Sequence, residues 1–285
     1  MKENQSKHAV EKMCKTFKVS RSGYYDWLHR KPSKRAKQTD AIKSEVHVIY
    51  KVSKNRYGSP KITEELRSRG WSVSRPRVAR IMRSEGLRSI INKKYRCRTT
   101  DSNHLLPIAE NHLNRDFSAS KPGQKWVSDI TYIPTNQGWL YLTIILDLFD
   151  RKVIGWALST TMTTKDTVVA AWRMAIRNRP TYGVLFHSDR GVQYASREFR
   201  EEIEKHDVKQ SMSRKGNCWD NAVAENFFKI LKSEMIYHFK YQSVLHAKND
   251  LFEFVEIWYN RKRIHSYLGY KTPEHFAKIN YLKSA

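Results

Sequence analysis

Apolar residues recur at helical spacing through the first ninety positions of the chain. Positions three and four apart predict two short helices within 5–29, the second with Ser20 as its N-cap. Three further helices are predicted between 40 and 87, the last of them opening at Ser74. Short helices in this succession are typical of helix-turn-helix units. The alternative is a small helical bundle with no special partner.

The pattern changes after a polar stretch that lacks periodicity. Runs rich in aromatic and branched residues then predict three strands, followed by alternating helix and strand. The expected strands are 126–133, 139–146, 153–158, 184–186 and 208–212, and the expected helices begin near Thr163, Ser196 and Asp220. Three meandering strands followed by helix, strand, helix, strand and helix is the order of a ribonuclease H-like α/β domain with a mixed five-stranded sheet.

The chain therefore divides into four expected segments. The first two form an all-α region: a helix-turn-helix-like segment at 1–38 and a helical, helix-turn-helix-like DNA-binding domain at 39–91. A linker follows at 92–122. The α/β domain and a C-terminal helical extension occupy 123–285.

The charge of the chain is strongly positive, at +25 over 285 residues. Residues 1–120 hold 28 Lys and Arg against 11 Asp and Glu, a net of +17, and the remainder holds 25 against 17, a net of +8. Nucleic acid is the partner that such a distribution favours. A merely solvated basic surface or an anionic membrane surface is the alternative. The helix that opens at Ser74 carries Arg75, Arg77 and Arg80, which favours binding in a DNA groove over a plain solvated face.

Cysteine usage and hydropathy exclude several classes of protein. The three cysteines lie far apart and form no CxxC pair, so neither a disulfide framework nor a zinc ribbon fits. The N-terminus is polar, without a secretory signal, and the most apolar run, 140–146, is too short to span a bilayer. We expect a cytoplasmic protein with no membrane partner.

Three carboxylates occupy positions from which they could converge. Asp129 lies inside the first expected strand, where an acid is costly unless a partner or a cation neutralises it. Asp189 follows the 184–186 strand, at the edge where α/β sheets place ligands, and Glu225 lies in a helix, with 35 residues between the two acids. Carboxylate oxygens are ligands for Mg²⁺. Each acid taken alone would be an ordinary surface carboxylate or helix cap.

Basic residues accompany Glu225. Lys229 and Lys232 follow it at i+4 and i+7, on the same side of the helix. The loop before that helix is basic and contains a glycine, and we expect Arg214 and Lys215 within it to contact DNA. A carboxylate beside several cations suits a metal ion next to a phosphate backbone.

Five runs of sequence resemble one family. WVSDITY at 126–132, HSDRGVQY at 187–194 and DNAVAENFFK at 220–229 resemble the catalytic core of bacterial insertion-sequence transposases. The similarity is to the integrase-like OrfB product of the IS-three type, whose core is related to retroviral integrases. YGSPK at 57–61 and YNRKRIHSYLG at 259–269 are similar to this family's flanking segments.

The resemblance implies a function and a set of site residues. Asp129, Asp189 and Glu225 would be the acidic triad of an integrase catalytic core. We expect them to hold Mg²⁺ or Mn²⁺, as two ions, for cleavage and strand transfer of double-stranded DNA at element ends and target sites. The family also implies a homo-oligomer on DNA and an upstream OrfA protein as partner, including as a frameshift fusion.

Two other functions remain open from the residues alone. One is a non-catalytic DNA-binding regulator, and the other is a ribonuclease H-like nuclease that does not join strands. Some nearby residues also have two interpretations. His187 and Arg190 would assist a phosphate or only pack, and Arg261, Lys262 and Arg263 would grip DNA or complement a helix end. Asp147 and Asp150 are expected to be strand-end or turn residues.

Overall fold

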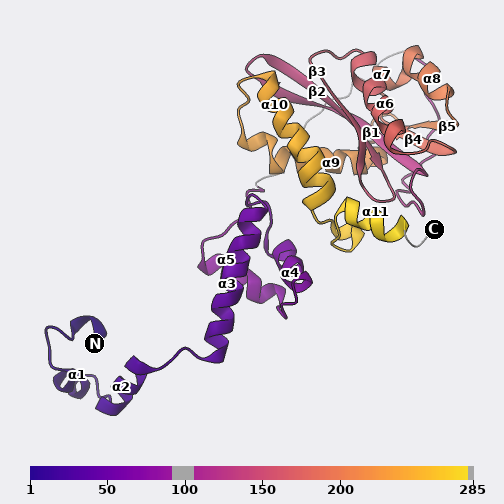
Figure 1. The fold of residues 1–285 in the computed structure, drawn as a ribbon. Coiled ribbons are helices and arrows are strands. Elements are labelled where there is room, and N and C mark those ends of the chain that lie inside the picture. Colours follow the sequence, from indigo (N-terminus) through magenta and orange to yellow (C-terminus); the bar gives the residue numbers. More distant parts are fainter. Residues whose placement is uncertain (92–105, 282–285) are drawn as a thin grey trace.

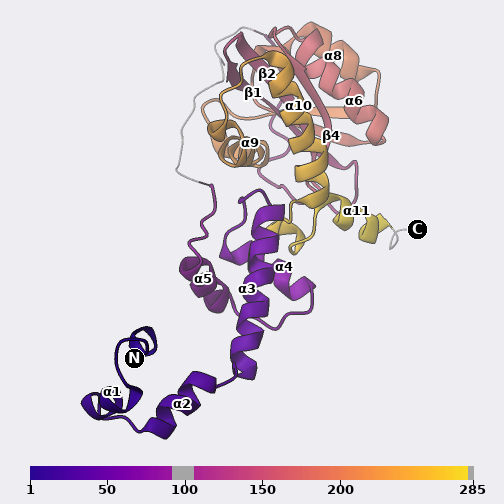
Figure 2. The same cartoon turned by 60° about the vertical axis from the view of Figure 1, so that its left-hand side comes forward.

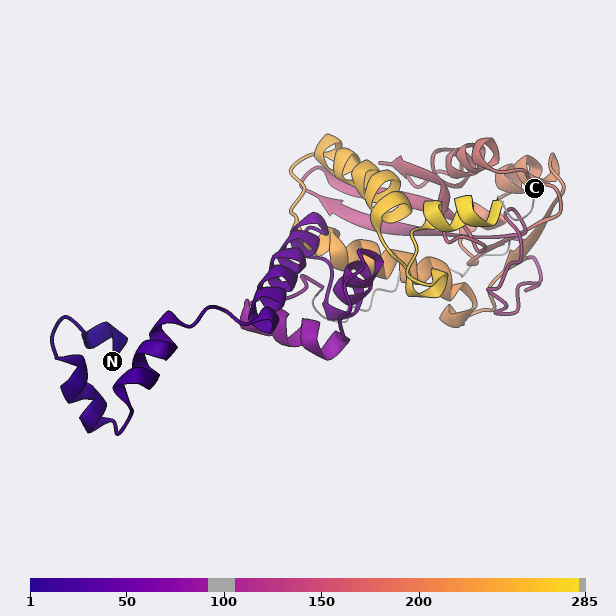
Figure 3. The ribbon, with the colours of Figure 1, turned by 60° about the horizontal axis from the view of Figure 1, so that its bottom comes forward.

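The computed structural model describes residues 1–91 and 106–281, arranged in three successive parts (Figure 1). A small N-terminal helical unit is followed by a three-helix unit and then by an α/β domain with further helices at its C-terminal end. The N-terminal unit lies away from the α/β domain, as Figures 1 and 3 both show. Each helix in the described part of the chain is too short or too polar to cross a bilayer.

Both helices expected in the N-terminal unit are present, as α1 (Val10–Thr16) and α2 (Arg21–His29). The Ser20 hydroxyl accepts a hydrogen bond from the Gly23 N–H at 3.0 Å, which confirms Ser20 as the N-cap of α2. A 3₁₀ turn, η1 (Lys2–Asn4), precedes them.

The three-helix unit packs around one apolar cluster. Its helices are α3 (Lys34–Val52), α4 (Ser59–Ser68) and α5 (Arg75–Ser84). Their buried residues recur at helical spacing and include Ile42, Val46, Ile49, Ile62, Leu66, Val78, Ile81 and Met82. Proline stands in the first turn of α4 and of α5, where no intrahelical N–H is needed.

The first of these helices begins earlier than its apolar pattern predicts. The Ser33 hydroxyl accepts from the Ala36 N–H at 3.1 Å, and this cap starts α3 at Lys34 in a stretch with almost no apolar residue. The boundary expected between residues 38 and 39 therefore lies inside a continuous helix.

Five strands form one mixed sheet in the order β3-β2-β1-β4-β5. The pairs β1–β2 and β2–β3 are antiparallel, and the pairs β1–β4 and β4–β5 are parallel. The strands are β1 (Lys125–Thr135), β2 (Gly138–Asp147), β3 (Val153–Ser159), β4 (Val184–Ser188) and β5 (Val208–Met212). This arrangement confirms the expected ribonuclease H-like α/β fold.

Helices cover both faces of the sheet (Figures 1 and 2). One face packs against α6 and α8 in a cluster that contains Trp126, Ile130 and Trp172, and the other packs against α9 and α10 in a cluster that contains Val127 and Ile133. Since alternate strand residues point to opposite faces, even-numbered positions at the start of β1 face α6 and odd-numbered ones face α9. The helical elements of this domain are η2 (Lys165–Val169), α6 (Ala170–Asn178), α7 (Val192–Ala195), α8 (Arg197–Glu204), η3 (Cys218–Asn221), α9 (Ala222–Glu234), η4 (Ile236–His238), α10 (Val244–Phe252), η5 (Glu253–Lys262), η6 (Ser266–Leu268) and α11 (Pro273–Tyr281).

The expected linker at 92–122 has two parts. Residues 92–105 lie outside the described residues, whereas 106–122 pack against the α/β domain. Leu113 is buried there, and the N–H groups of His112 and Leu113 both donate to the Ser211 hydroxyl, at 3.0 and 3.2 Å. Bonds to a residue about a hundred positions away leave no local periodicity, and for this reason the sequence pattern predicted only a connector.

The loop between α3 and α4 docks the three-helix unit onto the C-terminal helices. The Arg56 guanidinium lies over the Trp258 ring, 4.6 Å from its centroid, and Arg56 Nε donates to the Glu234 carbonyl at 3.2 Å. The Tyr57 hydroxyl accepts from the Ile264 N–H at 2.9 Å. The two segments that flank the core in sequence, around 57–61 and 259–269, therefore meet in space.

Candidate active site

Asp129 and Asp189 are brought level with one another by strand register. The parallel pairing of β1 with β4 sets Val127 opposite His187. Asp129 and Asp189 each lie two residues further along, so they reach the same level on the same face of the sheet. Asp189 follows the last residue of β4, and its Oδ1 accepts from the Gly191 N–H at 3.0 Å. That face is the one on which α9 packs.

Glu225 approaches from the first turn of α9. Burial raises the pKa of Asp129 well above its usual range, and the neighbouring carboxylates of Asp189 and Glu225 raise it further. Burial and the charge of Asp189 likewise raise the pKa of Glu225. Carboxylates that raise one another's pKa lie close together, so the structure brings the three predicted acids into one site. Their catalytic role stays a prediction.

One of the two predicted lysines lies beside these acids. Lys232, half-buried two turns along α9, lowers the pKa of Asp129. Lys229 is exposed one turn after Glu225. The site thus combines three carboxylates with a cation, and the net charge of this group is negative inside a strongly positive chain.

The donor chemistry of the three acids fits a hard divalent cation. All their donor atoms are carboxylate oxygens, and their mutual repulsion is what a bound cation would relieve. As the side chains stand, no group of three His, Cys, Asp or Glu residues within 1–91 and 106–281 is arranged to hold a metal ion. Glu225 is exposed, so its side chain has room to turn toward the two aspartates.

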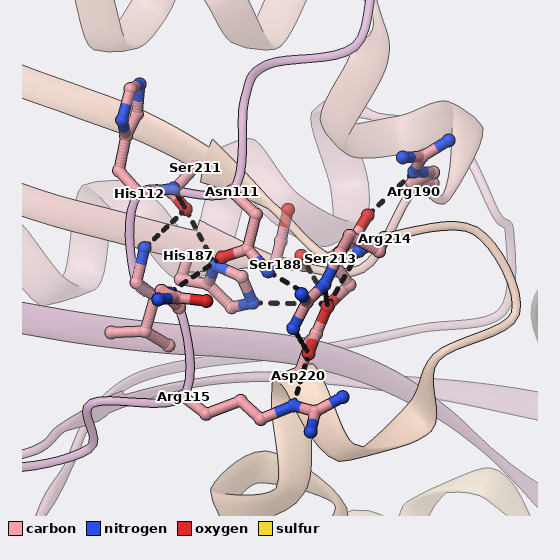
Figure 4. Close-up of polar contacts among 12 residues, drawn as sticks. Asn111, His112, Arg115, His187, Ser188, Arg190, Ser211, Ser213, Arg214 and Asp220 are labelled. Atoms are coloured by element: carbon pink, nitrogen blue, oxygen red, sulfur yellow. Dashed lines mark hydrogen bonds and ion pairs between the residues drawn. The ribbon is translucent and has the colours of Figure 1, made fainter.

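A hydrogen-bonded chain of serines and His187 holds the ends of β4 and β5 (Figure 4). The Ser211 hydroxyl already accepts two backbone N–H groups, so it donates its own proton to His187 Nδ1 at 2.8 Å. The ring proton then lies on Nε2 and donates to the Ser213 hydroxyl at 3.2 Å, and this hydroxyl in turn donates to the Ser188 carbonyl.

Burial lowers the pKa of His187 to about 4, so the ring is neutral. These contacts support the packing interpretation of His187. Its neighbour Arg190 donates from Nε to the Ser213 carbonyl.

The residues predicted to contact DNA have different surroundings. Arg75 and Arg80 on α5 and Lys215 in the 213–217 loop are exposed. Arg77 is half-buried and donates to the Thr39 hydroxyl at 3.0 Å. Arg214 forms a two-point ion pair with Asp220, with contacts of 2.8 and 2.7 Å. Arg77 and Arg214 therefore have partners inside the chain that the local sequence did not indicate.

Asp147 and Asp150 form a separate buried cluster with Arg179. Burial and the neighbouring Asp150 raise the pKa of Asp147 to about 6, against the opposing effect of two backbone N–H groups and Arg179. Asp147 ends β2 opposite Trp126 at the start of β1, and Asp150 lies in the turn that follows, so they are strand-end and turn residues as expected and lie apart from the triad.

The basic run 261–263 is divided between two roles. Arg263 is buried and paired with Glu234, whereas Arg261 is exposed beside Glu274. Arg263 therefore serves the interior of the protein, and only Arg261 and Lys262 face solvent.

Three residues near the triad were missed by sequence reasoning. Asp220 is fully buried in η3, next to Asn221, whose side-chain amide donates to the Ser128 carbonyl at 2.9 Å. The Ser128 hydroxyl donates its proton to the Ile144 carbonyl, so it accepts a hydrogen bond from the Tyr194 hydroxyl at 2.7 Å. The only available signal was the place of Asp220 and Asn221 just before the helix of Glu225.

Family comparison matches two regions of the chain. Residues 119–218 and 206–273 match two families that are both described as integrase core domain, and residues 37–95 match an HTH-like domain. Among solved structures, the HTLV-2 integrase catalytic core domain in complex with magnesium is 18% identical, with a TM-score of 0.43, over 56% of this chain and 99% of that one.

Curated relatives extend the similarity over nearly the whole chain. The insertion element IS600 uncharacterized 31 kDa protein of Shigella sonnei is 42% identical over 93% of this chain and 97% of the relative. The transposase InsF for insertion sequence IS3A of Escherichia coli K12 is 40% identical over 98% of both chains. With an integrase-type sheet, an HTH-like unit and this degree of identity, the chain belongs to the IS3-type family of insertion-sequence transposases with a DDE-type integrase core.

Proposed function

We propose that this chain cleaves DNA at the ends of an insertion element and joins those ends to target DNA, with Asp129, Asp189 and Glu225 as its catalytic carboxylates. The observation that supports the assignment most is the β1–β4 register, which brings Asp129 and Asp189 level on the face that α9 covers. The charges of Asp189 and Glu225 both raise the pKa of Asp129, which indicates that Glu225 also lies close to the two aspartates.

The three carboxylates are proposed to hold two Mg²⁺ or Mn²⁺ ions. Ions of this class, when bound, activate an attacking oxygen and stabilise the charge that develops on the leaving oxygen. The chain's own contribution is to fix the donors. Asp189 is oriented by the Gly191 N–H, and Asp129 accepts from the Ile130 N–H at 2.8 Å. The exposed Glu225 supplies the third carboxylate.

The reaction that fits such a site is phosphoryl transfer in two steps. Water attacks a phosphorus atom at the element end, a new P–O bond forms, and the bond to the 3′-oxygen breaks to leave a free 3′-hydroxyl. That hydroxyl then attacks a phosphorus of target DNA, so one phosphodiester bond is exchanged for another and no outside energy source is needed. No covalent bond between protein and DNA forms.

Basic residues around the site are proposed to hold the DNA backbone. Lys229 and Lys232 extend along α9 from Glu225, and Lys215 is exposed in the loop before it. On the three-helix unit, Arg75 and Arg80 are exposed on α5, and Arg77 beside them is half-buried. Contacts of this kind supply affinity that depends on salt and is largely independent of sequence.

We also propose that the protein acts as an oligomer on paired element ends. A fusion with an upstream OrfA protein is proposed as a further functional form. Both proposals follow from membership of the family.

A strand-transfer assay tests the catalytic proposal. A labelled duplex that carries the element's own end is incubated with target DNA and the purified chain, with Mg²⁺ or with EDTA. Wild type is compared with Glu225→Gln and with Glu204→Gln, which neutralises an exposed carboxylate on α8 of the same domain. We expect joined product from wild type and Glu204→Gln only, and only with metal present.

Other outcomes select the alternatives. Cleavage without joining would indicate a nuclease, and binding without either reaction, also in the OrfA fusion, would indicate a DNA-binding regulator. Joining by Glu225→Gln at the wild-type rate would show that Glu225 is not a catalytic residue.

A further inference from the structure

A buried carboxylate outside the triad lies at the centre of a polar network (Figure 4). Asp220 has no exposed side-chain surface, and its two oxygens accept five hydrogen bonds. Oδ1 accepts from Arg115 Nε at 2.8 Å and Arg214 Nη2 at 2.7 Å. Oδ2 accepts from Asn111 Nδ2 at 2.9 Å, and from Arg214 Nε at 2.8 Å and its backbone N–H at 3.0 Å. Every acceptor site of this carboxylate is therefore used.

This network joins parts of the chain that are far apart in sequence. Asn111 and Arg115 belong to the segment before β1, Arg214 follows β5, and Asp220 itself lies in η3, one residue before the cap of α9. A buried charge is stable only when it is paired and hydrogen-bonded, and here the paired guanidinium groups supply that compensation. The Arg214 guanidinium also holds the pKa of Asp220 well below its usual range, so the carboxylate is ionised.

The same turn is fixed on its other side. Asn221, the N-cap residue of α9, makes no side-chain cap bond to its own helix. It donates instead to the carbonyl of Ser128, the residue before Asp129. Asp220 and Asn221 together therefore fix the start of α9 between β5 and β1. Glu225 lies one turn further along this helix.

We propose that Asp220 is a positioning residue for the transposase reaction, which fixes the first turn of α9 so that Glu225 reaches the two aspartates. The inference rests on the proposed function of the triad. The five hydrogen bonds of Asp220 go to Asn111, Arg115 and Arg214, and none of them reaches a triad carboxylate. Its effect is transmitted through the backbone from 220 to 225.

The test compares two buried, paired aspartates. Asp220→Asn removes the central charge of the network, and Asp150→Asn removes an equally buried carboxylate that pairs with Arg179 away from the triad. Binding of Mn²⁺ to the full chain is measured by electron paramagnetic resonance of the free ion. Hydrogen exchange of the peptide 218–228 is measured on the same samples.

We expect Asp220→Asn to weaken Mn²⁺ binding by about 10- to 100-fold, as loss of a residue that orients ligands does. Exchange of 218–228 should become faster in the same variant. Asp150→Asn should leave both quantities as in wild type, whatever it does to overall stability.

A milder variant covers the case in which Asp220→Asn does not fold. Arg115→Met removes one donor, and its side chain is 45% exposed, so the fold loses little. It should weaken Mn²⁺ binding in the same direction but less. Its control is Arg197→Met, which removes an exposed arginine on α8.

The outcomes separate this inference from the function on which it rests. Unchanged Mn²⁺ binding in Asp220→Asn would overturn it, including when exchange alone becomes faster, since that result indicates a purely structural role. Wild type that binds no Mn²⁺ would contradict the metal-dependent function instead. In that case unchanged exchange of 218–228 in Asp220→Asn would still overturn the positioning role.

Discussion

The guanidinium of Arg263 pairs with the carboxylate of Glu234 through three contacts of 2.9–3.2 Å, and both side chains are buried. Glu234 is the last residue of α9, the helix that carries Glu225. The Trp258 indole N–H donates to Oε2 of Glu234 at 2.9 Å. The backbone carbonyl of Glu234 accepts from Arg56 of the α3–α4 loop. The far end of this helix is therefore fastened to both the C-terminal helices and the three-helix unit.

Loss of Arg263 should be strongly destabilising. Arg263→Met leaves Glu234 buried without its cation, and we expect the free energy of unfolding to fall by about 3–5 kcal/mol. The double variant Glu234→Gln/Arg263→Met leaves no unpaired charge and should lose less. Arg261→Met, at an exposed ion pair, should change stability by less than about 1 kcal/mol. Urea unfolding measures all three, and equal losses for Arg263→Met and Arg261→Met would contradict the prediction.

Lys61 should make the stability of the chain depend on pH above neutrality. Burial, and next the charge of Arg263, lower the pKa of Lys61 to about 7, from 10.5 for the unfolded chain. Between these values the unfolded state binds more protons, so the contribution of Lys61 to stability rises with pH from about 7 to 10.5. In Lys61→Met this part of the pH dependence should disappear. Urea midpoints of wild type and variant at pH 7 and 9.5 test it, and parallel changes in both would refute the assignment.

Gly155 should not tolerate a side chain. A Cβ at this position of β3 would lie 2.3 Å from the Ala171 carbonyl oxygen and 2.8 Å from the Ala175 Cβ, on the helix that covers the sheet. Gly155→Ala should therefore cost about 1–3 kcal/mol or more, because strand and helix must separate. Gly58→Ala is the comparison, since a Cβ there meets nothing closer than 3.8 Å. Thermal unfolding of the two variants measures the difference, and a similar melting temperature for both would show that the helix moves without cost.

The arginines exposed on α5 should contribute to DNA affinity through phosphate contacts. Arg75→Ala/Arg80→Ala removes two cations, and the slope of log K against log salt should fall by about 1.8 if both contact phosphates. A control with the same change of charge is Lys165→Ala/Lys209→Ala, two exposed lysines of the α/β domain. The prediction is tested by measuring the affinity for an element-end duplex over a range of salt concentrations. An equal effect of the two double variants would indicate a nonspecific charge effect.

The sequence by itself determined the order of the five strands and of the short helices that precede them. Apolar spacing gave α4 and α5, the aromatic and branched runs gave β1, β2 and β3, and Ser20 was identified as a cap because the caps of short helices act locally. The positions of Asp129 within a strand, Asp189 just after a strand and Glu225 within a helix followed from the same local patterns. These patterns reflect interactions of each residue with neighbours only a few positions away in the sequence.

The tertiary structure decided which residues have partners elsewhere in the chain. Asp220 and Arg115, and Glu234 and Arg263, each meet across 29 positions or more, so no periodicity indicates that these charges are buried and paired. Arg214, which is predicted to contact DNA, also pairs with Asp220, and its contact with DNA stays a prediction. Local pattern determines which element forms, because a turn or a strand is stabilised by its own neighbours. Pairing of distant charges depends on how those elements pack, since only packing removes the charges from water and makes a partner necessary.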